Sequence, residues 1–61
     1  MYLPLYIINY IDKDNFELKD SYFYTTRGAR NFLWDNRNKI FEPTVYLFGS
    51  MTEIKPEDLR D

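Results

Sequence analysis

The chain has 61 residues and contains neither cysteine nor histidine, so its fold has no disulfide bond and lacks the usual ligands of zinc and haem. A domain this short buries only about 60% of the surface that its unfolded chain exposes, which leaves a thin hydrophobic core. Six tyrosines, five phenylalanines and one tryptophan are large enough to make such a core dense. We therefore expect a single small domain over residues 1–61, stabilised by aromatic packing or by self-association.

The N-terminal part of the chain is typical of a β-hairpin. Residues 3–12 are rich in β-branched and aromatic residues and show no helical spacing, which predicts a strand. Residues 12–15 are polar and have the length of a hairpin loop, and residues 16–24 alternate as a second strand would. In the first strand, alternation places Leu3, Leu5, Ile7 and Ile11 on one face and Tyr2, Tyr6, Ile8 and Tyr10 on the other.

A helix is predicted over residues 26–37. Thr25 or Thr26 can cap its start, and the polar run DNRN, with Asn able to take a left-handed C-cap conformation, ends it. Helical spacing places Ala29, Phe32, Leu33 and Asn36 on one side. Gly28 weakens the first turn, which suggests that something approaches the backbone there.

Downstream of Pro43, a third strand is predicted over residues 44–54. Alternation places Val45, Leu47 and Met51 on one face and Tyr46, Phe48 and Ile54 on the other. Gly49 in its middle marks a bulge or a close approach. Residues 55–61 form a tail, and the proline followed by two acidic residues allows either a short helical turn or disorder.

These elements predict an α+β fold in the order β-β-α-β, with a three-stranded, mainly antiparallel sheet and one helix on its aliphatic face. The other face would then be uncovered and would carry Tyr2, Tyr6, Tyr10, Tyr46 and Phe48. A large uncovered aromatic face is unusual on a monomer and tends to mark a partner site. Two interpretations follow: a homodimer interface, or a scattered set of half-exposed tyrosines.

Basic residues concentrate in the helical segment. Residues 27–39 carry a local charge of +3, whereas the remainder of the chain carries −5, and the net charge is −2. A helical projection groups Arg27, Arg30, Trp34 and Arg37 as a stripe away from the apolar side. One interpretation of this Arg–Trp stripe is a binding surface, since both residue types are enriched at interface hot spots. The other is that residues 38–43 or the tail partly cover Trp34 and that arginines stack on its ring.

Nothing in the sequence predicts catalysis, a cofactor or a metal ion. The carboxylates, lysines and tyrosines show no recognisable catalytic spacing. The acidic residues after the first strand lack the glycine and the distant glutamate of a calcium loop. The segment TTRGAR has one glycine and no Lys-Ser or Lys-Thr pair, so it is not a phosphate-binding loop. We therefore expect a protein that is not an enzyme.

The function that this pattern favours is binding of another protein, as a compact inhibitor or adaptor. The Arg–Trp stripe would hold an acidic or aromatic patch. The acidic residues of the hairpin, Asp12, Asp14, Glu17 and Asp20, would engage a basic groove normally used by nucleic acid. Abundant Tyr, Phe, Asn, Ile and Lys are typical of an AT-rich genome, which points to a phage-encoded modulator of a bacterial host protein.

The sequence also allows two other functions. One is nucleic-acid binding by the Arg and Trp side chains of the helix, which an isoelectric point near 4.9 opposes. The other is a structural subunit that self-assembles through the tyrosine face. The apolar N-terminal run is interrupted by Pro4, is too short to span a bilayer and lacks the features of a signal peptide, so a cytoplasmic location without membrane contact is expected.

Overall fold

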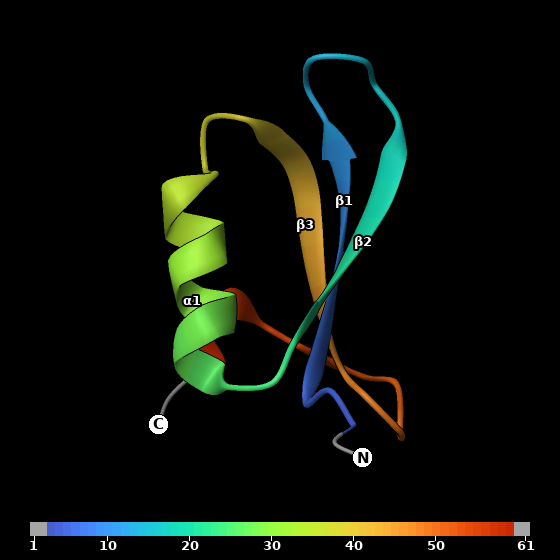
Figure 1. The fold of residues 1–61 in the computed structure, drawn as a ribbon, viewed down its shortest axis with the longest axis vertical. Helices are drawn as coiled ribbons and strands as arrows, with labels where there is room; N and C mark the ends of the chain where they lie inside the picture. Colours follow the sequence, from blue (N-terminus) through green and yellow to red (C-terminus); the bar gives the residue numbers. More distant parts are fainter. Residues whose placement is uncertain (1–2, 60–61) are drawn as a thin grey trace.

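Four strands and one helix make up the computed structural model, which describes residues 3–59 (Figure 1). The elements are β1 (Tyr6–Asp12), β2 (Leu18–Phe23), α1 (Thr26–Asp35), β3 (Ile40–Leu47), β4 (Thr52–Ile54) and a 3₁₀ turn, η1 (Pro56–Asp58). The strands form one antiparallel sheet in the order β2-β1-β3-β4. The α+β class, the antiparallel hairpin and the helix are confirmed, but the sheet has four strands rather than three and the element order is β-β-α-β-β.

The predicted third strand is in fact two strands. The chain turns over residues 48–51, and β4 then runs back beside β3, with Val45 opposite Ile54. Gly49 has φ +96°, a conformation that glycine adopts without steric cost. Gly49 thus serves a reversing turn rather than a bulge in a continuous strand. As a result Ile54 shares a face with Val45, contrary to the prediction.

β3 also begins earlier than predicted, at Ile40, and Pro43 lies within it. The register between β1 and β3 shifts between Asn9 and Ile11, because β3 has one extra residue there. Next to Pro43, Glu42 has φ +48°, as expected at a local irregularity of the strand. A bulge is a position where an inner strand tolerates proline, which has no N–H to donate.

The helix covers the tyrosine-bearing face of β1, so the predicted choice of face is wrong. The Tyr6 hydroxyl lies 3.1 Å from Thr26 Oγ1, and the Tyr10 ring lies 5.3 Å from the Phe32 ring. The Tyr10 hydroxyl has a further partner in Ser21 Oγ at 3.2 Å. Burying these rings is favourable because each brings a large aromatic surface while its hydroxyl keeps a hydrogen bond.

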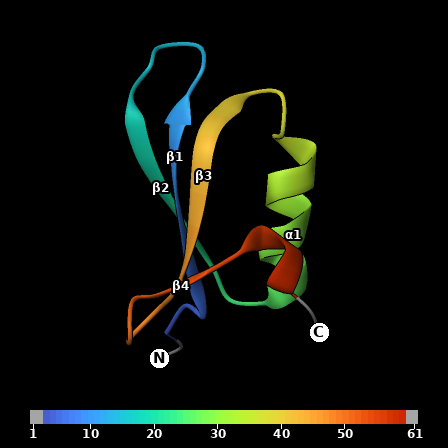
Figure 2. The same ribbon diagram turned by 180° about the vertical axis from the view of Figure 1, so that it is seen from behind.

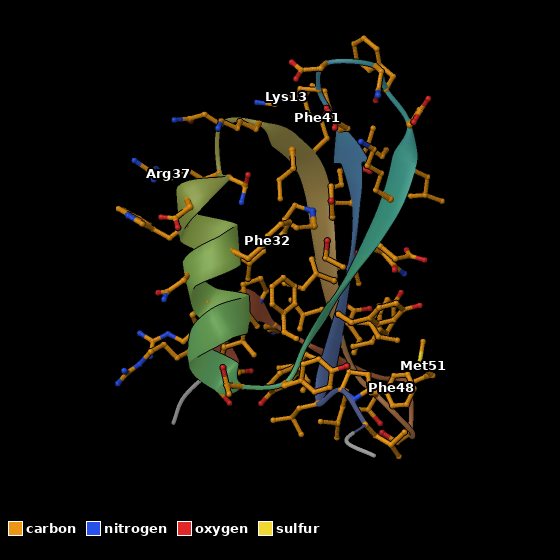
Figure 3. The ribbon with its side chains drawn as sticks, in the orientation of Figure 1. Lys13, Phe32, Arg37, Phe41, Phe48 and Met51 are labelled. Atoms are coloured by element: carbon orange, nitrogen blue, oxygen red, sulfur yellow. The ribbon has the colours of Figure 1, made fainter. Side chains whose placement is uncertain are left out.

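The uncovered face therefore has a different composition from the one expected. Tyr6 and Tyr10 lie under the helix, and Tyr2 lies outside the described residues. Tyr46 lies on the uncovered face opposite Ile7, and the Phe48 ring contacts Tyr22 of the same face edge-on, with 6.4 Å between ring centroids. Figure 3 shows Phe48 and Met51 on the side of the sheet away from α1, whereas Phe32 points from α1 towards the sheet.

The core combines residues from every part of the chain. Ile8, Ala29 and Val45 are fully buried and pack with Leu59, which is 3% exposed. Phe32 and Leu33 pack against this cluster, which confirms the predicted apolar side of the helix. The sequence did not indicate Leu59. Figure 2 shows how the chain reaches it: the orange-to-red segment runs from β4 across to α1.

The ends of α1 are set by side-chain caps. Thr25 Oγ1 accepts the N–H of Gly28 at 3.0 Å, which confirms the predicted start. Asn36 ends the helix and donates its side-chain amide to the Phe32 carbonyl at 2.9 Å, with φ −108° rather than a left-handed conformation. α1, the α-helix of residues 3–59, is neither long enough nor apolar enough to cross a membrane.

Candidate functional site

An open depression of about 580 Å³ lies between α1 and the C-terminal segment. The helical residues that line it recur at intervals of three or four, so they share one side of α1. The C-terminal segment joins them because burial of Leu59 in the core draws η1 against the helix. We call this site the α1 depression; its lining residues are Arg27, Arg30, Asn31, Leu33, Trp34 and Pro56.

Trp34 is the largest exposed side chain of the α1 depression, with 66% of its surface accessible. The guanidinium carbon of Arg37 lies 4.0 Å from the centroid of its ring, and Nη1 of Arg37 donates to the Trp34 carbonyl. Arg37 follows the end of α1 and reaches back along it, as Figure 3 shows at the end of the helix nearest Lys13. The predicted stacking of arginine on Trp34 is therefore present, but residues 38–43 and the described part of the tail, residues 55–59, leave most of Trp34 exposed.

The α1 depression is positively charged on its helical side. Arg27 and Arg30 are exposed, and neither forms an ion pair or side-chain hydrogen bond with another residue in the range 3–59. The first turn of α1 holds no acidic residue, and the partial positive charge of the helix N-terminus adds to that of the arginines. On the opposite side, the exposed Glu57 and Asp58 follow Pro56 without pairing with either arginine.

Of the four acidic residues predicted to form a contact surface on the hairpin, one stabilises the hairpin and three are exposed. Asp12 serves the hairpin itself: it accepts the Asp14 N–H at 2.8 Å and pairs with Lys19 Nζ at 3.0 Å. The hydrogen bond from the Asp14 backbone, followed by that from Lys19, lowers the pKa of Asp12, and the same carboxylate raises the pKa of Lys19. Asp14, Glu17 and Asp20 are exposed.

An exposed aromatic pair, which the sequence did not predict, lies near the turn of the β1–β2 hairpin. Phe16 and Phe41 stack with ring centroids 6.1 Å apart, and Lys13 Nζ lies 4.8 Å from the centroid of the Phe41 ring (Figure 3). Phe16 is 73% exposed and has φ +58°. The available signal was an aromatic residue placed directly after a polar loop.

The sequence identified part of the α1 depression and missed the rest. Arg27, Arg30 and Trp34 line it together, whereas Arg37 contacts only its rim through Trp34. Pro56 was missed because the tail composition indicated a turn but not where that turn would pack. Among residues 3–59, no group of three acidic side chains is placed to hold a metal ion.

No protein-family model matches the chain, and neither a curated protein nor a solved structure matches it. A functional assignment therefore rests on the geometry and charge of the site.

Proposed function

We propose that this protein is a small non-enzymatic module that binds another protein through the α1 depression. The observation that carries the proposal is Trp34, which is 66% exposed beside two arginines that have no ion partner in the described residues. Tryptophan is highly buried on average in folded proteins. Tryptophan and arginine also dominate the few residues that supply most of the binding energy of protein interfaces.

The lining of the α1 depression supports a partner with both acidic and apolar groups. Arg27 and Arg30 present planar guanidinium groups, which suit paired hydrogen bonds to a carboxylate. The Trp34 ring, with Leu33 and Pro56, offers an apolar surface beside them. A partner segment that carries a carboxylate next to an aromatic or branched apolar side chain would satisfy both parts of the lining.

The charges around the α1 depression favour a protein over a nucleic acid. Glu57 and Asp58 follow its lining residue Pro56, and the chain as a whole carries a net charge of −2. The backbone of a nucleic acid bound to the two arginines would extend past these carboxylates, which would repel its phosphates. A protein segment with a single carboxylate is free of this repulsion, because it places negative charge only where the arginines lie.

The proposal is tested by selecting seven-residue peptides from a random library on the immobilised wild-type protein. Selected peptides are expected to combine Asp or Glu with an adjacent apolar residue. Trp34→Ala should weaken their binding by about 30-fold or more, the loss typical of a hot spot. The same substitution should change the free energy of unfolding by about 1 kcal/mol or less, because most of the side chain is already in water.

Phe16→Ala is the matched control, because it removes another exposed aromatic ring at the far end of the hairpin. It should change peptide affinity by less than about threefold. Unchanged affinity after Trp34→Ala, or selected peptides without carboxylates, would contradict the proposal. Tighter binding of a single-stranded oligonucleotide than of any peptide, falling steeply with salt, would assign the site to nucleic acid instead.

A further inference from the structure

The outer edge of β2 is a second surface, formed by a different element from those that line the α1 depression. The strand order makes β2 and β4 the two edges of the sheet. β4 has only three residues and Pro56 follows it closely, which limits further pairing there. β2 has six residues, contains no proline, and has no strand beside its outer edge within residues 3–59 (Figure 1).

The pairing between β1 and β2 shows which backbone groups point outward. Asp12 N–H donates to the Glu17 carbonyl at 2.9 Å, and Leu5 N–H donates to the Phe23 carbonyl at 2.8 Å. In an antiparallel pair the residues of one strand alternate between facing the partner and facing away. The odd-numbered residues of β2 therefore bond to β1. The even-numbered residues, Leu18, Asp20 and Tyr22, direct their N–H and C=O groups away from the sheet.

The side chains of these three residues share the uncovered face, since each lies opposite a residue of that face on β1, such as Ile7 opposite Tyr22. Leu18 is 75% exposed and Tyr22 is 56% exposed. Between them lies the exposed carboxylate of Asp20, which forms no ion pair with any residue in the range 3–59. The edge thus presents an apolar, an acidic and an apolar side chain at two-residue spacing, together with free backbone donors and acceptors.

This pattern disfavours a second copy of the chain as the occupant. Two β2 edges related by a two-fold axis would pair antiparallel, and the register that pairs all three outward-facing residues sets Leu18 of one copy opposite Tyr22 of the other. That register places the two Asp20 side chains directly opposite each other. Like charges in directly opposite positions destabilise a strand pair. A partner strand with a basic residue at this position removes the repulsion and gains an ion pair.

We propose that the outer edge of β2 binds an extended segment of another protein as an added antiparallel strand. The segment carries a lysine or arginine opposite Asp20 and an apolar residue two positions to either side, opposite Leu18 and Tyr22. Backbone hydrogen bonds supply affinity in this mode of recognition, and the alternating side chains supply specificity.

The test uses two capped peptides, acetyl-Thr-Val-Thr-Lys-Thr-Val-Thr-amide and the same peptide with Glu in place of Lys, titrated into the isotopically labelled wild-type protein. The Lys peptide should shift the amide resonances of Leu18, Asp20 and Tyr22 and slow their hydrogen exchange. It should bind about tenfold more tightly than the Glu peptide. Asp20→Lys should reverse the preference, and Asp20→Asn should remove it.

Asp14→Lys is the matched control, because it makes the same charge change at an exposed acidic residue of the hairpin turn. It should leave the preference for the Lys peptide intact. Trp34→Ala should not affect either peptide, which separates this edge from the α1 depression. Equal affinity for the two peptides, reversal by Asp14→Lys, resonance shifts centred on α1, or a wild-type dimer paired through β2 would each overturn the proposal.

Discussion

The effects of substitutions at Gly28 and at the capping residue Thr25 are coupled through one atom, Thr25 Oγ1. This coupling gives a quantitative prediction for the first turn of α1. A Cβ atom added at Gly28 would lie 3.1 Å from Thr25 Oγ1 and 3.7 Å from Cδ1 of Phe23. The same Oγ1 accepts the Gly28 N–H at 3.0 Å. An alanine at this position must therefore push the capping hydroxyl away by a few tenths of an ångström, which weakens its hydrogen bond to the residue 28 N–H.

The expected free energies follow from two opposing effects. Replacing glycine by alanine in a helix gains about 1 kcal/mol, and losing a threonine cap costs about 1 kcal/mol. Gly28→Ala in the wild type should therefore change the free energy of unfolding by less than about 0.5 kcal/mol, because the gain in propensity is offset by a weakened cap. In a Thr25→Ala background the cap is already absent, so Gly28→Ala should stabilise by nearly the full amount.

Urea unfolding followed by circular dichroism measures all four members of this cycle. A chain of this length is expected to have a total stability of roughly 3–9 kcal/mol, so a coupling of about 1 kcal/mol is well resolved. Asn31→Ala, at an exposed helical position without contact to the cap, is the control and should give the same small gain in both backgrounds. An equal gain from Gly28→Ala in both backgrounds would refute the reasoning.

Two further predictions concern the core and the hairpin. Ile8→Ala should cost about 2–5 kcal/mol, because Ile8 is fully buried, whereas Leu18→Ala should stay within about 0.5 kcal/mol; urea midpoints compare the two. Because the folded-state pKa of Asp12 lies below its ordinary value of 3.8, its contribution to stability is present above that value and is lost as the pH falls through the lowered pKa. Asp12→Asn should therefore flatten the acid loss of stability below about pH 4, and a decline as steep as that of the wild type would contradict the assignment.

Local signals in the sequence account for the parts of the fold that were predicted. The cap at Thr25 and the spacing of Ala29, Phe32 and Leu33 predicted α1 and its buried side, because both depend on residues within one or two turns. The same helical spacing placed Arg27 and Trp34 together in the candidate site.

The features that were missed depend on contacts between distant segments. Both faces of β1 are apolar, so the choice of Tyr10 rather than Ile7 as a helix-facing residue rests on its fit to Phe32. Residues 44–54 read as one strand because apolar side chains continue across Gly49, and only the pairing of β4 with β3 reveals the turn. Pro56 joined the site through the burial of Leu59, which no local pattern indicated.

The position of Leu59 in the core has a consequence for how the chain folds during its synthesis. Its side chain packs with Ile8, Ala29 and Val45, so this hydrophobic cluster is incomplete until residue 59 has been added. At about 5–20 residues per second, the ribosome takes roughly 3–10 s to pass from Ile8 to Leu59. Throughout that interval the core lacks one of its buried residues, so its packing is completed only after β1, α1 and β3 have been made.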